Sequence, residues 1–419
     1  MKKVVIIGAG YAGVLTAQHL AKKLENTSDV RITLIDKNNY HTMRTEIHAA
    51  ATSRGKANSI IYDLKDIFKK TNVNLIFDTA IDIDFENKKV KCKNGEYEYD
   101  YLTISAGSQP TYFGIPGAEE FAKPFWTYDD AVALKAHFHD VFKRASQETD
   151  VNTRKQLLTF HIVGAGLTGI ELAGEVGEYI PMLCKKYKVN PSDVTVVNLD
   201  AMPRAIPNFP EKLSNRAAEI LGGLGIKMLF NTKVLSVKKD SIELETNGVA
   251  STVPTGTVIW SAGITANAIT QKAAEHLSAE RGFRIKDDPQ LKSETDKSVF
   301  VVGDNMFYIP KGKKSTVPQM VENCEQASKI VANNIAYLVT GNGKEKVYKP
   351  SLHGAMISLG AKQGIGYVGI GNFMVVLPSL PTQVFKRAVN IMYLAPVIGF
   401  DKIGSLVMHE FFAKRKIKY

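Results

Sequence analysis

Short apolar runs that suit buried strands are followed along this chain by glycine-rich turns and then by helix-like segments, and this order occurs twice. The apolar run 4–7 leads into Gly8, Gly10 and Gly13, and the apolar run 160–163 leads into Gly164, Gly166 and Gly169. Continuous apolar runs of this length are typical of strands buried on both faces of a parallel sheet. Each turn has the spacing G-x-G-x-x-G, so the pattern predicts two dinucleotides bound by one chain.

The three glycines of each turn have different physical roles. The first lets the strand turn sharply, the second lets the backbone approach a pyrophosphate, and the third lets the helix pack closely. The pyrophosphate then lies at the helix N-terminus, where backbone N–H groups lack partners. A tight turn without a ligand explains one such motif well, but it explains two in the same context poorly.

An acidic residue ends the strand that follows each glycine motif. Asp36 follows the strand-like run 31–35, and Asp200 follows 194–199, after an extra loop expected over 185–193. A carboxylate in this position suits the hydroxyls of an adenosine ribose. Asp200 should repel a 2′-phosphate and so favour NADH over NADPH, although the nearby Arg204 can soften that preference.

The two halves share a plan of glycine turn, acidic strand end, hairpin and small-residue turn. In residues 1–112 the last turn contains Ala106 and Gly107, and in residues 113–263 it contains Gly263. This internal duplication predicts an α/β fold with two Rossmann-like, doubly wound dinucleotide-binding domains. A further buried strand, 299–302, ends in Gly303 and Asp304, whose carboxylate can hold a ribityl hydroxyl or cap the next helix.

The tail has a different character. Residues 364–385 carry no charge but contain glycines and prolines, so they should not form a membrane-spanning helix. Apolar residues then recur at helical spacing, at Phe385, Ala388, Val389 and Met392, and again at Ile403, Leu406, Val407 and Phe411. With the basic end 414–418, this pattern predicts amphipathic helices in a membrane interface. A helix pair packed on the body of the protein, or on a second subunit, is the alternative.

Composition narrows the class of protein. A chain of 419 residues suits two or three domains, and 44% hydrophobic with 23% charged residues is typical of globular proteins. The net charge of +11 suits nucleic acid, an anionic membrane or anionic cofactors, but no nucleic-acid module is found, so nucleic acid is not an expected partner.

Cys92, Cys184 and Cys324 form no close pair, which fits a reducing compartment. The core strand begins at Val4, so no signal peptide is expected, and no metal site is predicted.

The chain resembles the type II NADH:quinone oxidoreductases, which are single-subunit flavoproteins with two dinucleotide-binding domains. The residues that carry this resemblance lie in six segments: 6–13, 103–108, 162–175, 257–263, 300–304 and 354–359. It implies FAD and NADH as the bound dinucleotides. The reaction would be hydride transfer from NADH to FAD, then electron transfer to a membrane quinone of the menaquinone or ubiquinone type, without proton pumping.

The resemblance also implies an organisation. It places FAD in 1–112 and 264–340, NADH in 113–263, and a membrane-anchoring or dimerisation region in 341–419. The expected location is peripheral, on an anionic membrane surface at the cytoplasmic face, and a homodimer is expected. The residues expected to bind FAD are Gly8, Gly10, Tyr11, Ala12, Gly13, Asp36, Lys37, Ala106, Gly107, Gly303 and Asp304. Those expected to bind NADH are Gly164, Gly166, Thr168, Gly169, Asp200 and Gly263.

Glu171 is the first of four residues to which the resemblance gives a catalytic role. It is expected in the first turn of the second nucleotide-binding helix, where it would position NADH rather than abstract a proton. Two plainer explanations exist. A carboxylate is favourable in a first helical turn, and Glu171, Glu175 and Glu178 share a helix face that can simply be a solvated acidic surface.

The other three expected catalytic residues concern the quinone. The family has two glutamines four residues apart after a proline, and here Pro318 precedes Glu322 and Gln326. Residues at i and i+4 share a helix face, so both can point at one cavity. Glu322 replaces the first glutamine, which can alter the quinone preference or add a proton-transfer group. Lys386 matches a lysine-bearing stretch near the quinone channel. An ordinary polar helix face explains Glu322 and Gln326 equally well without the resemblance.

Related flavoproteins are less consistent with the sequence. Disulfide reductases need a redox cysteine pair, and flavoprotein peroxidases and oxidases need a cysteine within 37–48, where this chain has none. Sulfide:quinone oxidoreductases need reactive cysteines beside the flavin, and Cys184 and Cys324 lie in unsuitable contexts. A soluble NADH-dependent reductase of a carrier and a non-catalytic redox sensor remain as alternatives.

Overall fold

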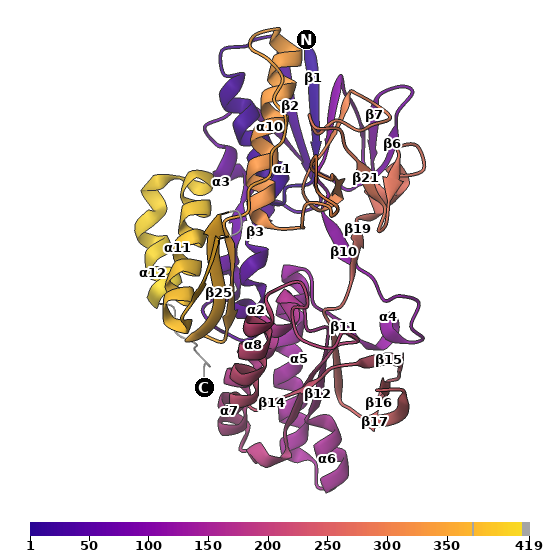
Figure 1. Ribbon diagram of the computed structural model, residues 1–419, viewed down its shortest axis with the longest axis vertical. Coiled ribbons are helices and arrows are strands. Elements are labelled where there is room, and N and C mark those ends of the chain that lie inside the picture. The colour runs from indigo at the N-terminus through magenta and orange to yellow at the C-terminus, as the bar shows by residue number, and fades with distance from the viewer. Residues whose placement is uncertain (371–372, 413–419) are drawn as a thin grey trace.

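Two lobes lie one above the other, with the C-terminal segment along one flank of both (Figure 1). The structure, a computed structural model, describes residues 1–370 and 373–412. The first lobe is built on a five-stranded parallel sheet of order β22-β9-β1-β2-β5. Its strands are β1 (Lys2–Ile7), β2 (Val30–Asp36), β5 (Val73–Phe77), β9 (Tyr101–Ile104) and β22 (Val299–Val301). The late strand β22 joins this sheet beside β9, so the chain returns to the first lobe after passing through the second.

The second lobe repeats this arrangement. Its five-stranded parallel sheet has the order β11-β18-β12-β13-β14. The strands are β11 (Lys123–Pro124), β12 (Thr159–Val163), β13 (Thr195–Leu199), β14 (Ile226–Leu229) and β18 (Thr257–Trp260). In each lobe the glycine turn follows a central strand, β1 or β12, and leads into a helix. The predicted α/β fold with two Rossmann-like domains is confirmed.

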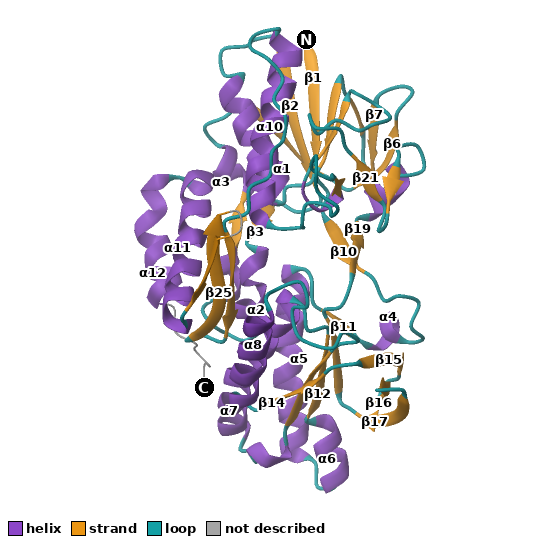
Figure 2. Cartoon of the chain, in the orientation of Figure 1, coloured by secondary structure: helices purple, strands orange, loops and turns teal. Residues whose placement is uncertain are grey.

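Helices cover these sheets (Figure 2). In the first lobe, α1 (Tyr11–Lys23) packs against α10 (Val321–Thr340), and α2 (Ile47–Ala51) and α3 (Leu64–Phe68) are short. The second lobe has α4 (Ala118–Phe121), α5 (Tyr128–Gln147), α6 (Val151–Leu157), α7 (Leu167–Tyr187) and α8 (Glu211–Gly223), and α9 (Ala268–Ala273) follows the return to the first lobe. The expectation of a loop over 185–193 is partly wrong, because α7 continues to Tyr187 and a 3-10 turn forms at Pro191–Asp193.

Small sheets and a two-stranded connection complete the lobes. The connection consists of β10 (Ser108–Pro110) and β19 (Ile264–Ala266), which pair antiparallel where the chain crosses between the lobes. The hairpin predicted before the small-residue turn of the first half forms β6 (Ala80–Asp84), β7 (Lys89–Cys92) and β8 (Glu96–Glu98). The remaining strands are β3 (Tyr40–Thr42), β4 (Ile61–Asp63), β15 (Thr232–Val237), β16 (Ser241–Thr246), β17 (Val249–Pro254), β20 (Ala279–Glu280), β21 (Arg284–Lys286) and β23 (Met306–Phe307).

The C-terminal unit, which we define as residues 349–412, is an antiparallel sheet with two helices. It contains β24 (Gly354–Leu359), β25 (Gln363–Ile370), β26 (Phe373–Leu377), α11 (Ser379–Ile398) and α12 (Ile403–Phe412). β24 packs on α7 and β25 on α8, whereas α11 contacts α1 and α3, so this unit touches both lobes. Among the described residues, no helix combines the length and apolarity needed to cross a bilayer. The side chain of Phe411 and the basic end 414–418 lie outside the described residues.

In the first part of α11 the apolar stripe faces outward and polar residues are buried, whereas the buried residues of its last turns are mostly apolar. Phe385, Val389 and Met392 are about half or more exposed, at 48%, 50% and 74%. Lys386 and Asn390, on the opposite side, are buried. The helix pair does pack on the body of the protein through its other side, but these three residues do not, so they remain available to a membrane or to a second subunit. On α12, by contrast, Leu406 is buried against the core.

Candidate active site

The first glycine turn has a backbone that only glycine suits. Gly8 has φ +97°, a conformation that strains any side chain, and it lies against the backbone of Ser105. A Cβ on Gly13 would stand 1.8 Å from the Gly8 carbonyl oxygen, so the helix packs directly on the turn. Nothing lies within 4 Å of where a Cβ of Gly10 would be. The turn therefore presents open space at the position where a pyrophosphate would approach.

The second turn repeats this geometry. Gly164 has φ +102°, and a Cβ on Gly169 would stand 1.9 Å from the Gly164 carbonyl oxygen. Gly166, like its counterpart in the first turn, faces open space. The next residues, Leu167 and Thr168, begin α7. Both turns thus have the shape that dinucleotide binding needs.

The two acidic strand ends hold their glycine turns in the same way. One oxygen of Asp36 accepts the backbone N–H of Ala9, and one oxygen of Asp200 accepts that of Ala165, both at 2.6 Å. The second oxygen of each accepts the N–H two residues later, at 2.8 Å. The hydrogen bonds to Asp36 favour its ionised form, but burial has the larger effect and raises the pKa of its carboxyl. The guanidinium of Arg204 donates to two backbone carbonyls of its own loop, which occupies donors that a 2′-phosphate would need.

A third turn, around Gly303, meets the small-residue turn of the first lobe. The amide of Asn305 binds Gly107 on both sides, accepting its N–H at 2.8 Å and donating to its carbonyl at 2.7 Å. Asp304 accepts a hydrogen bond from the hydroxyl of Ser108. Its side chain therefore points across to the first lobe's turn rather than capping the following 3-10 turn, in which no side-chain cap is present. Sequence reasoning missed Asn305, which no motif marks.

Glu171 and Lys386 meet at the boundary between the second lobe and the C-terminal unit. Lys386 Nζ lies 2.6 Å from Glu171 Oε1 and 2.5 Å from the hydroxyl of Ser358. Ser358 also donates its backbone N–H to Glu171, at 3.0 Å. Glu171 is the fifth residue of α7, and no acidic residue lies in the first turn. The expectation that Glu171 sits in that first turn is therefore wrong, and the helix dipole does not account for it.

The glutamates that follow on α7 are not a solvated acidic surface either. Glu175 is fully buried and lies 2.8 Å from Arg54 Nε. Glu178 accepts the backbone N–H of Ala361 at 3.0 Å from each of its oxygens. Thr52 donates its hydroxyl to Glu175 at 3.0 Å. These carboxylates connect α7 to a loop of the first lobe and to the C-terminal unit.

A further carboxylate, Glu46, completes this buried group. One oxygen lies 3.4 Å from Lys386 Nζ and accepts the amide of Asn390 at 3.0 Å, and the other accepts from Arg54 at 3.0 Å. The imidazole of His48 lies 3.6 Å from Glu171 and 3.9 Å from Glu46. We call Glu46, His48, Arg54, Glu171, Glu175 and Lys386 the charged cluster. The sequence identified Glu171 and Lys386 as catalytic candidates and Glu175 only as part of an acidic helix face, whereas Glu46, His48 and Arg54 belong to no motif.

Within the cluster, neighbouring charges have a larger effect than burial on the pKa values of Glu46 and Lys386, but not on that of His48. Burial opposes the charged form of Glu46, but Lys386 and Arg54 lower its pKa well below the usual range. Burial also works against the charge on Lys386, yet Glu171 and Glu46 leave its pKa raised. For His48, burial prevails and lowers the pKa. These directions favour the charged forms of Glu46 and Lys386 and the neutral form of the His48 imidazole.

Glu322 and Gln326 lie together elsewhere, on α10. Glu322 contacts the ring of His353 and accepts its backbone N–H at 3.2 Å. Gln326 exchanges two hydrogen bonds with the backbone of Ser351, at 2.6 and 3.0 Å. Both side chains thus face the same segment, which leads into β24. That strand carries Ser358 to the charged cluster, so one short segment contacts both groups of expected catalytic residues.

The cysteines do not form a redox centre. All three thiols are free and buried. Burial raises the pKa of Cys92 and Cys184 to about 11 and raises that of Cys324 as well. The thiolate is the reactive form, so these residues are poor nucleophiles at neutral pH.

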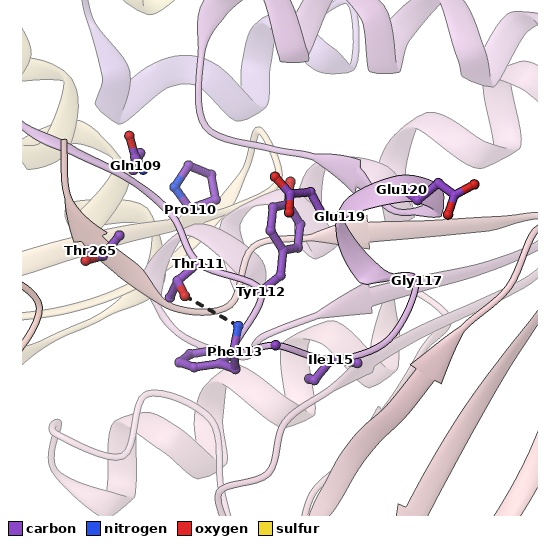
Figure 3. Close-up of a pocket in the computed structure, with 11 residues that line it drawn as sticks. Gln109, Pro110, Thr111, Tyr112, Phe113, Ile115, Gly117, Glu119, Glu120 and Thr265 are labelled. Carbon is purple, nitrogen blue, oxygen red and sulfur yellow. Dashed lines mark hydrogen bonds between the residues drawn. The ribbon is translucent and has the colours of Figure 1, made fainter. Parts of the chain in front are cut away.

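An open pocket of about 500 Å³ borders the crossing between the lobes (Figure 3). Its lining includes Gln109, Tyr112 and Thr265 and the acidic residues Glu119 and Glu120. No lysine or arginine of the described chain is among the residues that line it. The negative charges of Glu119 and Glu120 disfavour a phosphate group in this pocket, which argues against a third nucleotide site.

Comparison with known proteins agrees with this arrangement. The chain matches the pyridine nucleotide-disulphide oxidoreductase family over residues 2–328. It is 32% identical, over 369 residues, to the type II NADH:quinone oxidoreductase of Staphylococcus aureus strain NCTC 8325 / PS 47, a match that covers 88% of this chain and 90% of that protein.

Solved structures share the fold. NDH2 from Plasmodium falciparum in complex with NADH superposes with a TM-score of 0.85 at 18% identity and covers all of both chains. The sulfide:quinone oxidoreductase from Aquifex aeolicus has a TM-score of 0.76 at 20% identity and covers 99% of this chain and 96% of its own. The resemblance inferred from sequence motifs is confirmed.

Proposed function

Since this chain belongs to the pyridine nucleotide-disulphide oxidoreductase family and, within it, to the type II NADH:quinone oxidoreductases, we propose that it oxidises NADH through bound FAD and reduces a membrane quinone, without pumping protons. FAD bound at the first turn would supply a hydride acceptor for NADH and an electron donor for the quinone. The single observation that carries this proposal is the pair of matching glycine turns, each open at its second glycine and each held by an aspartate.

We assign FAD to the first turn and NADH to the second. Residues 1–112 and 264–340 would form the FAD domain, and Asn305, which ties Gly107 to the Gly303 turn, would keep its two parts together. The residues named above for FAD would bind it there. Residues 113–263 would bind NADH at Gly164, Gly166, Thr168, Gly169, Asp200 and Gly263. Asp200 and the occupied donors of Arg204 support a preference for NADH over NADPH.

Glu171 and Lys386 are proposed to act where the two half-reactions meet. Glu171 lies on the NADH-domain helix that begins at the second glycine turn, so its carboxylate would position the nicotinamide. Lys386 carries a buried positive charge. A fixed cation in a low-dielectric site stabilises negative charge that develops on a substrate, and here that substrate is the quinone taking up electrons.

Glu322 and Gln326 are proposed to contact the quinone from α10. They share one face, as their contacts to the 351–353 segment indicate. The carboxylate of Glu322 would give this site a proton-transfer group that an amide lacks. We propose a quinone of the menaquinone or ubiquinone type as the acceptor.

The C-terminal unit, as part of the region 341–419, is proposed to hold the enzyme on the membrane. Large apolar residues are exposed on β26, α11, α12 and the 3-10 turn Phe400–Lys402: Met374, Val375, Val376, Leu380, Val384, Phe385, Val389, Met392, Phe400 and Met408. Apolar area of this kind on one side of a basic protein suits an anionic bilayer surface. We propose a peripheral location at the cytoplasmic face, where NADH is available, and a homodimer as the assembly.

Anaerobic stopped-flow absorbance tests the function. The flavin absorbance of the purified protein should bleach on mixing with NADH and return on mixing with a soluble quinone analogue. Bleaching that quinone does not reverse would point to a soluble carrier reductase or to a sensor. A protein without flavin would contradict the assignment of the first turn.

A further inference from the structure

Glu46 belongs to neither glycine turn, yet both oxygens of its carboxylate have partners. It ends a 3-10 turn, Arg44–Glu46, in the first lobe and is 6% exposed. Its oxygens contact a lysine and an asparagine of α11 and an arginine of its own loop, as given above. A buried carboxylate needs such partners, because an isolated ionised group in the interior is very costly.

The ammonium of Lys386 is held between carboxylates from different lobes. Glu171, from α7 of the second lobe, lies 2.6 Å from Nζ, and Glu46, from the first lobe, lies 3.4 Å from it. The hydroxyl of Ser358 is the third group at this nitrogen. Lys386 therefore sits where both lobes and the C-terminal unit meet, and its position depends on all three.

We propose that Glu46 is a positioning residue for quinone reduction, which holds the ammonium group of Lys386 against Glu171 and fastens α11 to the first lobe. This inference rests on the proposed function, in which Lys386 stabilises charge on the quinone. Glu46 acts through Lys386 and is not itself a catalytic residue.

The charge balance around Lys386 explains why one carboxylate would not suffice. The groups facing it are Glu171, Glu46, His48 and, at longer range, Arg54, whose charge opposes that of the lysine. Burial also disfavours the ammonium form. Removal of the negative charge of Glu46 leaves burial and Arg54 opposed by Glu171 alone, so the pKa of Lys386 should fall.

A purely structural role for Glu46 makes a different prediction. Glu46 and Arg54 would then only join the loop to α7, and their loss would reduce stability and both half-reactions alike. A positioning role instead confines the effect to the step that uses Lys386. It also makes that effect depend on pH and on the presence of the lysine.

The test compares Glu46→Gln, Lys386→Met and the double variant with the wild type, as full-length flavin-loaded protein. The enzyme is reduced with NADH, and flavin reoxidation by a soluble quinone analogue is followed by anaerobic stopped-flow across the neutral and alkaline pH range. We expect Glu46→Gln to be reoxidised about tenfold more slowly at alkaline pH, with the fall in rate beginning at least about one pH unit lower than in the wild type. In the Lys386→Met background, Glu46→Gln should have no further effect.

Control variants separate the explanations. Glu219→Gln, at an exposed glutamate of α8, makes the same chemical change and should match the wild type. Glu46→Asp keeps the charge on a shorter side chain, so it should restore the pH profile at a lower rate. If Glu46→Gln does not retain flavin, the test rests on Glu46→Asp alone. Flavin reoxidation of Glu46→Asp at the wild-type rate at every pH would then contradict the proposal.

Three results would overturn the inference. One is a pH profile of Glu46→Gln that matches the wild type. Another is a double variant whose loss in the rate of flavin reoxidation equals the product of the two single losses, because Glu46 would then act independently of Lys386. The third is a wild-type protein that NADH reduces but quinone does not reoxidise, which would overturn the proposed function itself, whereas the first two leave that function standing.

Discussion

Lys386 Nζ lies 2.6 Å from Glu171 Oε1, although 215 residues separate them in the sequence. One residue belongs to α11 of the C-terminal unit and the other to the helix that begins at the second glycine turn. The C-terminal unit is therefore more than an appended anchor. It supplies a buried cation to a group of acidic residues drawn from both lobes.

The cation of Lys386 should contribute substantially to stability. Lys386→Met would remove the cation beside Glu171 and leave Glu46 with Arg54 alone, and breaking a buried pair from one side typically costs about 3–5 kcal/mol. We expect a loss of that size in the free energy of unfolding, measured with urea and tryptophan fluorescence. Lys362→Met changes an exposed lysine of the same unit and should shift stability by less than about 0.5 kcal/mol. Equal effects of both variants would contradict this account of the cluster.

Replacement of the matching glycines Gly13 and Gly169 should affect different steps, flavin binding in the first case and reduction by NADH in the second. Gly13→Ala would place a methyl group 1.8 Å from the Gly8 carbonyl oxygen, so the protein should purify without flavin. Gly169→Ala makes the equivalent clash at the second turn, so the protein should keep its flavin but be reduced by NADH at least about tenfold more slowly. Flavin absorbance and stopped-flow reduction measure the two effects. The reverse outcome would exchange the nucleotide assignments.

A control for these variants lies on α8. Gly222 has nothing within 4 Å of where its Cβ would be, so Gly222→Ala should leave flavin content and reduction rate unchanged.

Glu322→Gln should change only the quinone step. It removes the charge that Glu322 presents to His353 while it keeps the shape of the side chain. We expect the KM for a quinone analogue or the rate of flavin reoxidation to change about fivefold or more, since a lost charge contact is worth about 1 kcal/mol or more. Reduction by NADH should not change. A variant altered only in its reduction by NADH would contradict the placement of Glu322 at the quinone site.

The apolar surface of α11 is best tested by point substitutions. Deletion of 385–419 would also remove Lys386 and Asn390, which are buried, so its effect could not be assigned to the membrane. The double variant Phe385→Ser and Met392→Ser changes only exposed side chains. It should lower co-sedimentation with anionic vesicles at least about tenfold, because burial of each large apolar side chain is worth about 1.5–3 kcal/mol. Reduction by NADH should be unchanged.

Two further outcomes distinguish the membrane from a second subunit. Vesicle binding by the wild type should weaken with salt, because the attraction of a basic protein to an anionic surface is screened. If the double variant binds vesicles normally but sediments as a smaller species than the wild type, the surface joins two copies of the chain instead.

Acid should destabilise the protein through its buried histidines. Burial lowers the pKa of His161 from 6.5 to about 4, and its ring bonds the hydroxyl of Thr255 at 2.9 Å. The unfolded chain therefore takes up the proton first. The stability that the neutral ring contributes is complete above pH 6.5 and is lost as the pH falls towards 4. His161→Asn should reduce the pH slope of the unfolding free energy in this window by about 1.4 kcal/mol per pH unit.

Urea unfolding at a series of pH values measures that slope. His276→Asn, at an exposed histidine, is the matched control and should keep the wild-type slope. An unchanged slope in His161→Asn would show that this ring is protonated in the folded state.

The local patterns of the chain predicted the parts of the site that lie along a continuous segment. Gly8 and Gly164 have the left-handed backbone that their motif requires, and Asp36 and Asp200 end the expected strands. These features depend on neighbours a few residues away. The spacing of residues along the chain was therefore enough to predict the glycine turns and the acidic strand ends, and from their repetition the duplicated fold.

The charged cluster could not be predicted in this way, because its members come from separate parts of the chain. Glu46 and Arg54 belong to no motif, and their value lies only in the partners that folding brings to them. The α7 glutamates were interpreted as a possible solvated face, since helical spacing does not show what packs on top. For the same reason, the spacing on α11 identified its apolar stripe but not the side on which Lys386 is buried.

The most direct test of the central claim is a two-step anaerobic stopped-flow experiment on the purified protein. NADH should bleach the flavin absorbance, and a menaquinone or ubiquinone analogue should then restore it quickly enough to sustain turnover. This result would establish electron transfer from NADH to quinone through the two nucleotide sites. A protein that NADH reduces but that no quinone reoxidises would contradict the account.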